Sequence, residues 1–209
     1  MQIKICGLMR LKDVDYVNEA LPDYAGFVFY EKSRRCISKE QAVSFRKHMN
    51  KQIRAVGVFV NEAPEKIIEL LKSGCIDIAQ LHGDETENAI RKIKEESGKP
   101  VWKAVVIRSD KDAEAFNDSS ADMLLFDGGM GSGRPFQREY LVGVKRPFFL
   151  AGGMDVQRIK EAEELKGVCG IDISSGVETD GCKDKQKMKE AVQAVHMLSE
   201  KERAVKNGK

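Results

Sequence analysis

The chain has 209 residues, of which 42% are hydrophobic and 33% are charged, and its formal net charge is +2. This length suffices for one well-buried core, and prolines number only five, so we expect a single domain over residues 1–209 with a frayed basic tail from about residue 200. The near balance of 35 basic and 33 acidic residues argues against a nucleic-acid or membrane surface.

Cysteine and histidine usage argues against a disulfide framework and a multi-histidine metal site. The chain has five cysteines, an odd number, and no two of them have CxxC spacing. This usage is typical of reduced thiols in the cytoplasm. Only three histidines occur. We recognise no signal peptide and no run of about 20 apolar residues that could cross a membrane. The sequence therefore favours a cytoplasmic protein.

Short apolar runs recur along the chain and are interpreted as buried strands. In chain order they cover Ile3–Cys6, Tyr24–Phe29, Arg54–Val60, Ile76–Leu81, Val101–Val106, Met123–Asp127, Pro147–Ala151 and Cys169–Ile173. They begin roughly 20 to 30 residues apart, which leaves room for a helix between each pair. Continuous apolar strands are typical of parallel sheets buried on both faces. The sequence therefore predicts an α/β fold of eight βα units, a (β/α)8 TIM barrel.

The segments between these runs carry helical signals. Ser38 and Gln41 form a capping box, and Pro64 stands at the start of another helix. The helical pattern is clear over Leu11–Leu21, Glu85–Ser97, Asp155–Leu165 and Lys185–Lys201, and weaker over Asp110–Asn117 and Gln137–Val144. The alternative architecture is an open doubly wound sheet, which is weakened because no G-x-G-x-x-G motif follows the first strand.

In a (β/α)8 barrel the active site lies at the carboxyl ends of the strands, which singles out particular residues. Asp127 ends the sixth strand and is followed by the glycine-rich residues 128–133. Cys6 ends the first strand and could reach the same pocket. A thiol and a carboxyl group on opposite sides of one pocket suit a general base and a general acid. The alternatives are a turn-capping Asp and a buried strand Cys.

Basic residues follow two further strands. Arg34 and Arg35 come after the second strand, where an arginine can hold a substrate carboxylate by two parallel hydrogen bonds. The alternative is a solvated pair of charges. His82 follows the fourth strand, and with no obvious partner carboxylate it is expected to be a secondary residue of the pocket.

The loops after the seventh and eighth strands have the composition of a phosphate site. Gly152 and Gly153 expose backbone N–H groups, and Ser174, Ser175 and Gly176 add hydroxyls and another bare amide. Phosphate sites in this fold are often built from these two loops. The alternative is two ordinary turns that use glycine and serine.

Several motifs, spread from about residue 2 to residue 198, together resemble one family. They are the segments 4–8 (KICGL), 58–61 (VFVN), 80–83 (QLHG), 150–154 (LAGGM) and 172–178 (DISSGVE). The chain resembles the N-(5′-phosphoribosyl)anthranilate isomerases of tryptophan biosynthesis. This resemblance implies a cofactor-free Amadori rearrangement of phosphoribosylanthranilate, a small-molecule substrate, to 1-(2-carboxyphenylamino)-1-deoxyribulose 5-phosphate.

The resemblance also implies roles for individual residues. Asp127 would be the general acid that opens the furanose ring, and Cys6 the general base that takes the C2 proton. Arg35 would hold the anthranilate carboxylate, with Arg34 as the alternative because it stands where the family usually has proline. The predicted substrate-binding set also includes His82, and the two glycine-serine loops would hold the phosphate. Residues 131–138 lack the family's usual Asp-Trp pair.

Three other functions are considered. The isomerase of histidine biosynthesis would be expected to end its first strand in Asp and to carry a second phosphate loop. A metal-dependent pentose-phosphate epimerase would need several His and Asp ligands at strand ends. A catalytically silent barrel that senses a sugar phosphate would not need Cys6, Asp127 and an arginine together. We expect a monomer or a homodimer.

Overall fold

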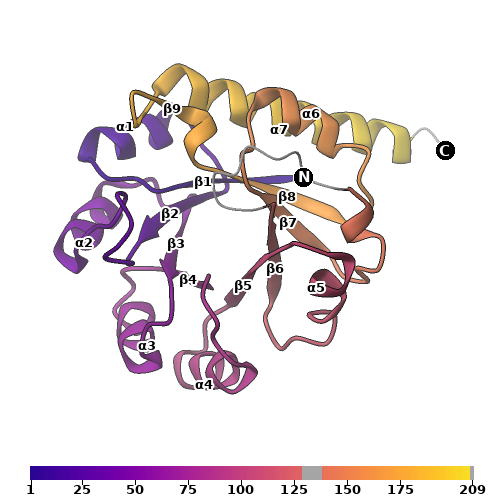
Figure 1. Cartoon of the computed structure of the whole chain (residues 1–209). Coiled ribbons are helices and arrows are strands. Elements are labelled where there is room, and N and C mark those ends of the chain that lie inside the picture. Colours follow the sequence, from indigo (N-terminus) through magenta and orange to yellow (C-terminus); the bar gives the residue numbers. More distant parts are fainter. Residues whose placement is uncertain (129–137, 208–209) are drawn as a thin grey trace.

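The computed structural model describes residues 1–128 and 138–207, and within these residues eight parallel strands close into a barrel (Figure 1). Each strand pairs with the next in the chain, and β8 pairs with β1 to close the ring. The predicted (β/α)8 TIM barrel is confirmed. The alternative of an open sheet is wrong, because Gln2 to Ile5 of β1 are in register with Gly170 to Ile173 of β8.

The barrel strands agree closely with the apolar runs of the sequence. They are β1 Gln2–Cys6, β2 Tyr24–Val28, β3 Arg54–Phe59, β4 Ile78–Leu81, β5 Val101–Val106, β6 Met123–Asp127, β7 Phe148–Ala151 and β8 Val168–Ile173. The largest difference from the prediction is at β4, which begins at Ile78 rather than at Ile76.

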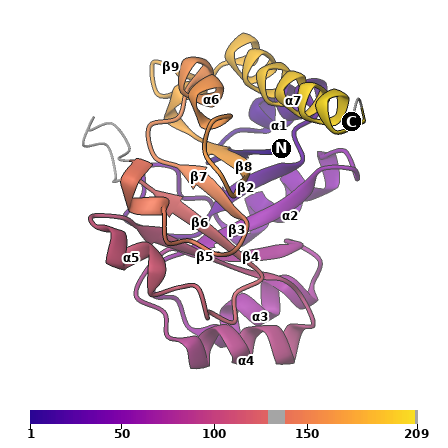
Figure 2. The same cartoon turned by 90° about the vertical axis from the view of Figure 1, so that its right-hand side faces the viewer.

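The helices lie outside the strands. They are α1 Leu11–Ala20, α2 Lys39–His48, α3 Pro64–Lys72, α4 Glu87–Ser97, α5 Asp110–Glu114, α6 Val156–Ala162 and α7 Lys185–Asn207, with short 3-10 helices η1 Arg138–Leu141 and η2 Ser175–Val177. Both weak helical patterns form shorter helices than predicted, α5 and η1, whereas α7 ends at Asn207 rather than at Lys201. Figure 2 shows α3 beside α4 and α7 beside α1, and both pairs are in contact.

Apolar side chains form two layers. One layer fills the barrel itself, where Tyr24, Trp102 and Phe149 have ring centroids 4.9 to 5.8 Å apart. The larger layer lies between the strands and the helices. Strands that contribute to both layers must be apolar on both faces, which explains why the sequence shows continuous runs rather than alternation.

A short hairpin after β8 was not predicted. Strands β9 Glu178–Thr179 and β10 Cys182–Lys183 pair in antiparallel orientation. Asp180 and Gly181 join them with φ angles of 50° and 76°, a conformation that glycine and aspartate tolerate. This hairpin places charged side chains at the rim of the barrel, where the candidate site lies. No helix in the described parts of the chain is long and apolar enough to cross a membrane.

Candidate active site

Cys6 and Asp127 occupy the last positions of β1 and β6. All barrel strands are parallel, so both residues lie on the same rim, together with the loops that follow β2, β7 and β8. Strands β7 and β8 separate them by the shorter way round the ring. The fold therefore brings the predicted acid and base to one end of the barrel, on different sides of its mouth.

The Cys6 thiol is half-buried and leans against β2. Cys6 is in register with Gly26, where a Cβ atom would lie 2.7 Å from the Cys6 sulfur. Glycine at this position therefore leaves room for the thiol. Burial raises the pKa of Cys6, and the positive charges of Lys4 and Lys183 only partly offset this effect. A general base at this position has cationic neighbours that favour its thiolate form.

A buried ion pair lies directly below Cys6. The side chain of Lys4 is fully buried and donates a hydrogen bond of 2.9 Å to Asp172 Oδ2. Burial alone would lower the pKa of Lys4, but Asp172 and Cys6 raise it above its ordinary value. Among the described residues, the other carboxylate oxygen of Asp172 is buried without a hydrogen-bond partner.

The sequence interpretation did not assign a role to Lys4 or Asp172. One signal was present, because Lys4 interrupts an apolar strand and shares the strand face of Cys6, two residues away. Asp172 occurs within a motif that we used only for the resemblance. An unsatisfied buried carboxylate oxygen beside the predicted base is a group that a ligand hydroxyl could satisfy.

Asp127 lies next to His82. The Nε2 atom of His82 is 3.6 Å from Asp127 Oδ2. The sequence showed no obvious partner carboxylate for His82, and the fold supplies one, because β4 and β6 bring the two side chains to the same rim. The backbone of Gly152 also lies close to the Asp127 carboxylate, because a Cβ atom at Gly152 would be 2.5 Å from Asp127 Oδ1. The positive φ of 88° at Gly152 is one that glycine adopts readily, and the missing side chain leaves room for the Asp127 carboxylate.

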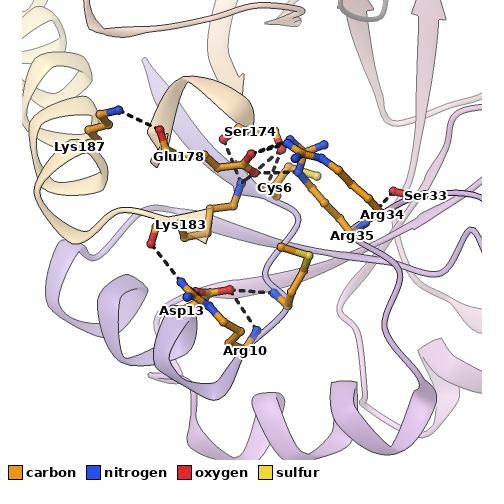
Figure 3. Close-up of polar contacts among 11 residues, drawn as sticks. Cys6, Arg10, Asp13, Ser33, Arg34, Arg35, Ser174, Glu178, Lys183 and Lys187 are labelled. Carbon is orange, nitrogen blue, oxygen red and sulfur yellow. Dashed lines mark hydrogen bonds and ion pairs between the residues drawn. The ribbon is translucent and has the colours of Figure 1, made fainter. Parts of the chain in front are cut away.

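The two arginines after β2 both bind Glu178, the first residue of β9 (Figure 3). Arg35 donates from Nε to Oε1 at 2.7 Å and from Nη2 to Oε2 at 2.8 Å. Arg34 donates a single hydrogen bond of 2.7 Å from Nη2. The side chain of Arg34 is 59% exposed and that of Arg35 only 19%. Arg35 is therefore the inner arginine, and it lies beside Cys6 in Figure 3.

Lys183 completes this cluster and links it to the first strand. Its ammonium group donates to Glu178 Oε1 at 2.8 Å and to the carbonyl oxygen of Ser174 at 2.9 Å. Burial lowers the pKa of Lys183 despite its contact with Glu178. The Ser174 hydroxyl donates to the carbonyl oxygen of Cys6 at 3.0 Å, so it ties the loop after β8 to the end of β1.

The two predicted phosphate loops are in contact with each other. A Cβ atom at Gly176 would lie 2.0 Å from the carbonyl oxygen of Met154, so only glycine allows this approach. Gly152 and Gly153 have positive φ angles of 88° and 61°. The fold therefore brings Gly152, Gly153, Ser175 and Gly176 together at one part of the rim. Phosphate binding at these loops stays a prediction.

All the predicted site residues are among the described residues, but one segment noted in the sequence is not. The glycine-rich segment after Asp127 falls in residues 129–137, which include most of the segment that lacks the family's Asp-Trp pair. Within residues 1–128 and 138–207, no group of three or more His, Cys, Asp or Glu side chains is arranged to hold a metal ion.

Comparison with known sequences gives consistent matches along the chain. A family model described as N-(5′-phosphoribosyl)anthranilate (PRA) isomerase matches residues 3–194. An N-(5′-phosphoribosyl)anthranilate isomerase of Endomicrobium trichonymphae is 45% identical over 203 residues, which cover 94% of this chain and 99% of that protein.

Solved structures give the same result. Phosphoribosyl anthranilate isomerase from Thermotoga maritima superposes with a TM-score of 0.86 at 33% identity, covering 94% of this chain and 99% of that one. A phosphoribosyl anthranilate isomerase in complex with reduced 1-(o-carboxyphenylamino)-1-deoxyribulose 5-phosphate superposes with a TM-score of 0.83 at 32% identity, with the same coverage.

Proposed function

This chain belongs to the N-(5′-phosphoribosyl)anthranilate isomerase family, and we propose that it catalyses the rearrangement of phosphoribosylanthranilate to 1-(2-carboxyphenylamino)-1-deoxyribulose 5-phosphate in tryptophan biosynthesis. The observation that carries this proposal is the position of Cys6 and Asp127 on one rim of the closed barrel. The reduced product bound to a relative of 32% identity supports the choice of substrate.

Asp127 acts as the general acid in the first step. It gives a proton to the ring oxygen of the ribose while the C1–O bond breaks, and the nitrogen lone pair forms the C1=N bond of a Schiff base. The nearby His82 Nε2, 3.6 Å away, is suited to contact the same oxygen or to orient the carboxyl group.

Cys6 acts as the general base in the second step. Its thiolate removes the proton from C2, and the C–H electron pair forms the C1=C2 bond while the C1=N electrons return to nitrogen. The resulting enolamine tautomerises to the ketone. Lys4 and Lys183 supply the positive charge that favours the thiolate in this buried place.

Three groups of residues hold the substrate. Arg35 binds the anthranilate carboxylate. Arg34 is the more exposed of the two arginines and supplies a second positive charge on the outer side of Arg35. The loops after β7 and β8 bind the phosphate through Gly152, Gly153, Ser174, Ser175 and Gly176. Support for the phosphate site comes from the close contact of the two loops at Gly176.

The alternative functions have less support. An isomerase of histidine biosynthesis is expected to have Asp at the end of β1, where this chain has Cys6. A metal-dependent epimerase would need several His and Asp ligands at strand ends, and His82 is the single histidine that the sequence offers at such a position. A silent sugar-phosphate sensor would not require the acid, the base and Arg35 on one rim.

We also propose a domain organisation, an assembly state, a location and a cofactor requirement for the enzyme. The chain acts as a single domain, as a monomer or a homodimer, in the cytoplasm and without a cofactor. Composition supports this setting, because the charge is nearly balanced and the cysteines lack any disulfide or zinc spacing.

The first experiment is steady-state conversion of phosphoribosylanthranilate, generated in situ, by the wild type, Cys6→Ser and Asp127→Asn. Each substitution removes one acid or base, so we expect kcat to fall about 10²- to 10⁴-fold in each variant. Circular dichroism confirms that the variants fold.

Two matched controls make the same chemical changes away from the rim. Cys75→Ser alters a buried thiol that precedes β4, and Asp122→Asn alters a carboxylate that precedes β6 and binds Val101 N and Lys94. Both should retain near-normal kcat. A wild type without activity would refute the proposed function, whereas an active Cys6→Ser would refute only the identity of the base.

A further inference from the structure

Glu178 is the centre of the charged cluster between the hairpin and the loop after β2 (Figure 3). Its side chain is only 4% exposed and accepts four hydrogen bonds. Oε1 accepts from Arg35 and Lys183, and Oε2 accepts from Arg35 and Arg34. A carboxylate offers about four lone-pair sites, so Glu178 is saturated by the protein and has none left for a ligand. These contacts hold the pKa of Glu178 at about 2 despite its burial.

The contact between Glu178 and Arg35 fixes the plane of the guanidinium group. Two parallel hydrogen bonds, 2.7 and 2.8 Å long, join the Nε–Nη2 edge of Arg35 to the two carboxylate oxygens. The aliphatic part of Arg35 lies on Gly7, where a Cβ atom would be 2.3 Å from its Cδ. Arg35 is thus confined from two sides.

This arrangement leaves part of Arg35 for a ligand. A guanidinium group has five N–H donors, and Glu178 uses two of them. The other three, on Nη1 and Nη2, make no hydrogen bond to the described residues. They form the edge that can bind a second carboxylate by two hydrogen bonds. Arg35 can therefore hold Glu178 with one edge and a ligand carboxylate with the other.

The Glu178 carboxylate is itself held firmly. Lys183 donates to it from a fully buried ammonium group, and Lys187 donates to the Glu178 backbone carbonyl at 2.8 Å. Arg10 binds the backbone carbonyl of Lys183 at 3.1 Å and forms an ion pair with the buried Asp13. The hairpin is therefore anchored to both α7 and α1, and it presents Glu178 in one position.

We propose that Glu178 is a positioning residue that orients Arg35 to bind the carboxylate on the aromatic ring of the substrate. This inference rests on the proposed function. Glu178 does not touch the substrate and acts only through Arg35. Loss of its carboxylate would leave Arg35 charged but free to rotate, so the enzyme would lose discrimination for a carboxylated ligand rather than general affinity.

The test compares two ligands by calorimetric titration of the full chain. One is reduced 1-(o-carboxyphenylamino)-1-deoxyribulose 5-phosphate, and the other is the same molecule without the ring carboxylate. The measured quantity is the ratio of their dissociation constants. For the wild type we expect the carboxylate to improve affinity about 10- to 100-fold, which corresponds to a charged pair of hydrogen bonds.

In Glu178→Gln we expect this ratio to fall below about 5, while the affinity for the ligand without the carboxylate changes little. In steady-state assays, KM for phosphoribosylanthranilate should rise more than kcat falls. In an Arg35→Met background, Glu178→Gln should have no further effect on the ratio, because its effect passes through Arg35.

A second variant keeps the inference testable if Glu178→Gln does not fold. Glu178→Asp retains the charge that Lys183 requires but is one methylene shorter, so it cannot keep both Arg35 hydrogen bonds in place. Its ratio should also fall. The matched control is Asp77→Asn, which removes a carboxylate paired with Arg46 at 3.2 Å, before the start of β4 at the opposite end of the barrel. This control should keep the wild-type ratio.

The outcomes separate this inference from the proposed function. A wild-type ratio retained in both Glu178 variants would overturn the positioning role alone. Equal loss of affinity for both ligands would also overturn it, because it would indicate a purely structural role. A wild type that turns over phosphoribosylanthranilate but binds both ligands equally would overturn the carboxylate-binding role of Arg35, and this inference with it, while the isomerase activity would stand. A wild type that does not turn over phosphoribosylanthranilate would overturn the proposed function.

Discussion

At the residue scale, two opposing effects determine the protonation of Cys6. Burial raises the pKa of the thiol, and the negative charge of Asp172 acts in the same direction. Lys4 and Lys183 act in the opposite direction, and Arg35 also lies close enough to interact. The net effect is a raised pKa, so the thiol is mainly protonated at neutral pH in the free enzyme.

This environment predicts the pH dependence of the reaction. A general base works as its thiolate, and a raised pKa moves the thiolate to higher pH. The value of kcat/KM, which reports the free enzyme, should therefore rise steadily between about pH 7 and pH 9. The measurement is a pH profile of kcat/KM at constant ionic strength.

Alkylation of Cys6 provides an independent readout. The rate of its reaction with iodoacetamide, followed by mass spectrometry, should rise over the same pH range, since the thiolate is the nucleophile. A Cys36→Ser/Cys182→Ser variant removes two other half-buried thiols as a background. A kcat/KM that is flat or falls with pH would contradict a base with a raised pKa.

At the element scale, local signals and their outcomes can be compared directly. The capping box of α2 is present, with Ser38 accepting from the backbone N–H of Gln41 and the Gln41 side chain accepting from the backbone N–H of Ser38. Pro64 begins α3 as predicted. These features depend on residues only three or four positions apart, so the sequence is sufficient to predict them.

Removal of this cap should cost stability without affecting the site. Ser38→Ala loses one side-chain acceptor at the start of α2, which typically costs about 1 kcal/mol of unfolding free energy. The measurement is urea unfolding followed by circular dichroism. Ser38→Asp retains an acceptor and should remain close to the wild type. Because Ser38 is a helix cap, kcat/KM should be unchanged, and a large loss of activity would contradict this interpretation.

At the scale of the whole molecule, the ion pair between Lys4 and Asp172 spans the closure of the barrel. Lys4 belongs to β1 and Asp172 to β8, and the two are paired in register. Both side chains are almost completely buried, so each depends on the other for its charge to be tolerated. The first and last strands of the barrel are thus joined by charge as well as by backbone hydrogen bonds.

A double-mutant cycle tests this dependence. Lys4→Met leaves Asp172 as an uncompensated buried charge and should cost about 3–5 kcal/mol of unfolding free energy. Asp172→Asn should also destabilise, because it leaves Lys4 charged. The double variant removes both charges and should be more stable than the sum of the two losses predicts. Additive losses would show that the two groups are energetically independent.

Sequence patterns were sufficient to predict the fold class, the strands to within a few residues, and the positions of Cys6 and Asp127 at strand ends. Continuous apolar runs and their regular spacing are local features of the chain, and they identify the strands. Active sites of this fold lie at the carboxyl ends of the strands, so the predicted strand ends also indicate the site. The same reasoning indicated the glycine and serine loops after β7 and β8, because glycine is required where backbones approach closely.

The contacts between residues far apart in the sequence became known from the fold alone. The hairpin of β9 and β10 is too short to give a periodic signal, yet it brings Glu178 to Arg34 and Arg35 and makes Arg35 the inner one. His82 meets Asp127 because β4 and β6 share a rim. Such contacts follow from barrel closure, which brings together charges far apart in the sequence, and no local pattern of the chain records them.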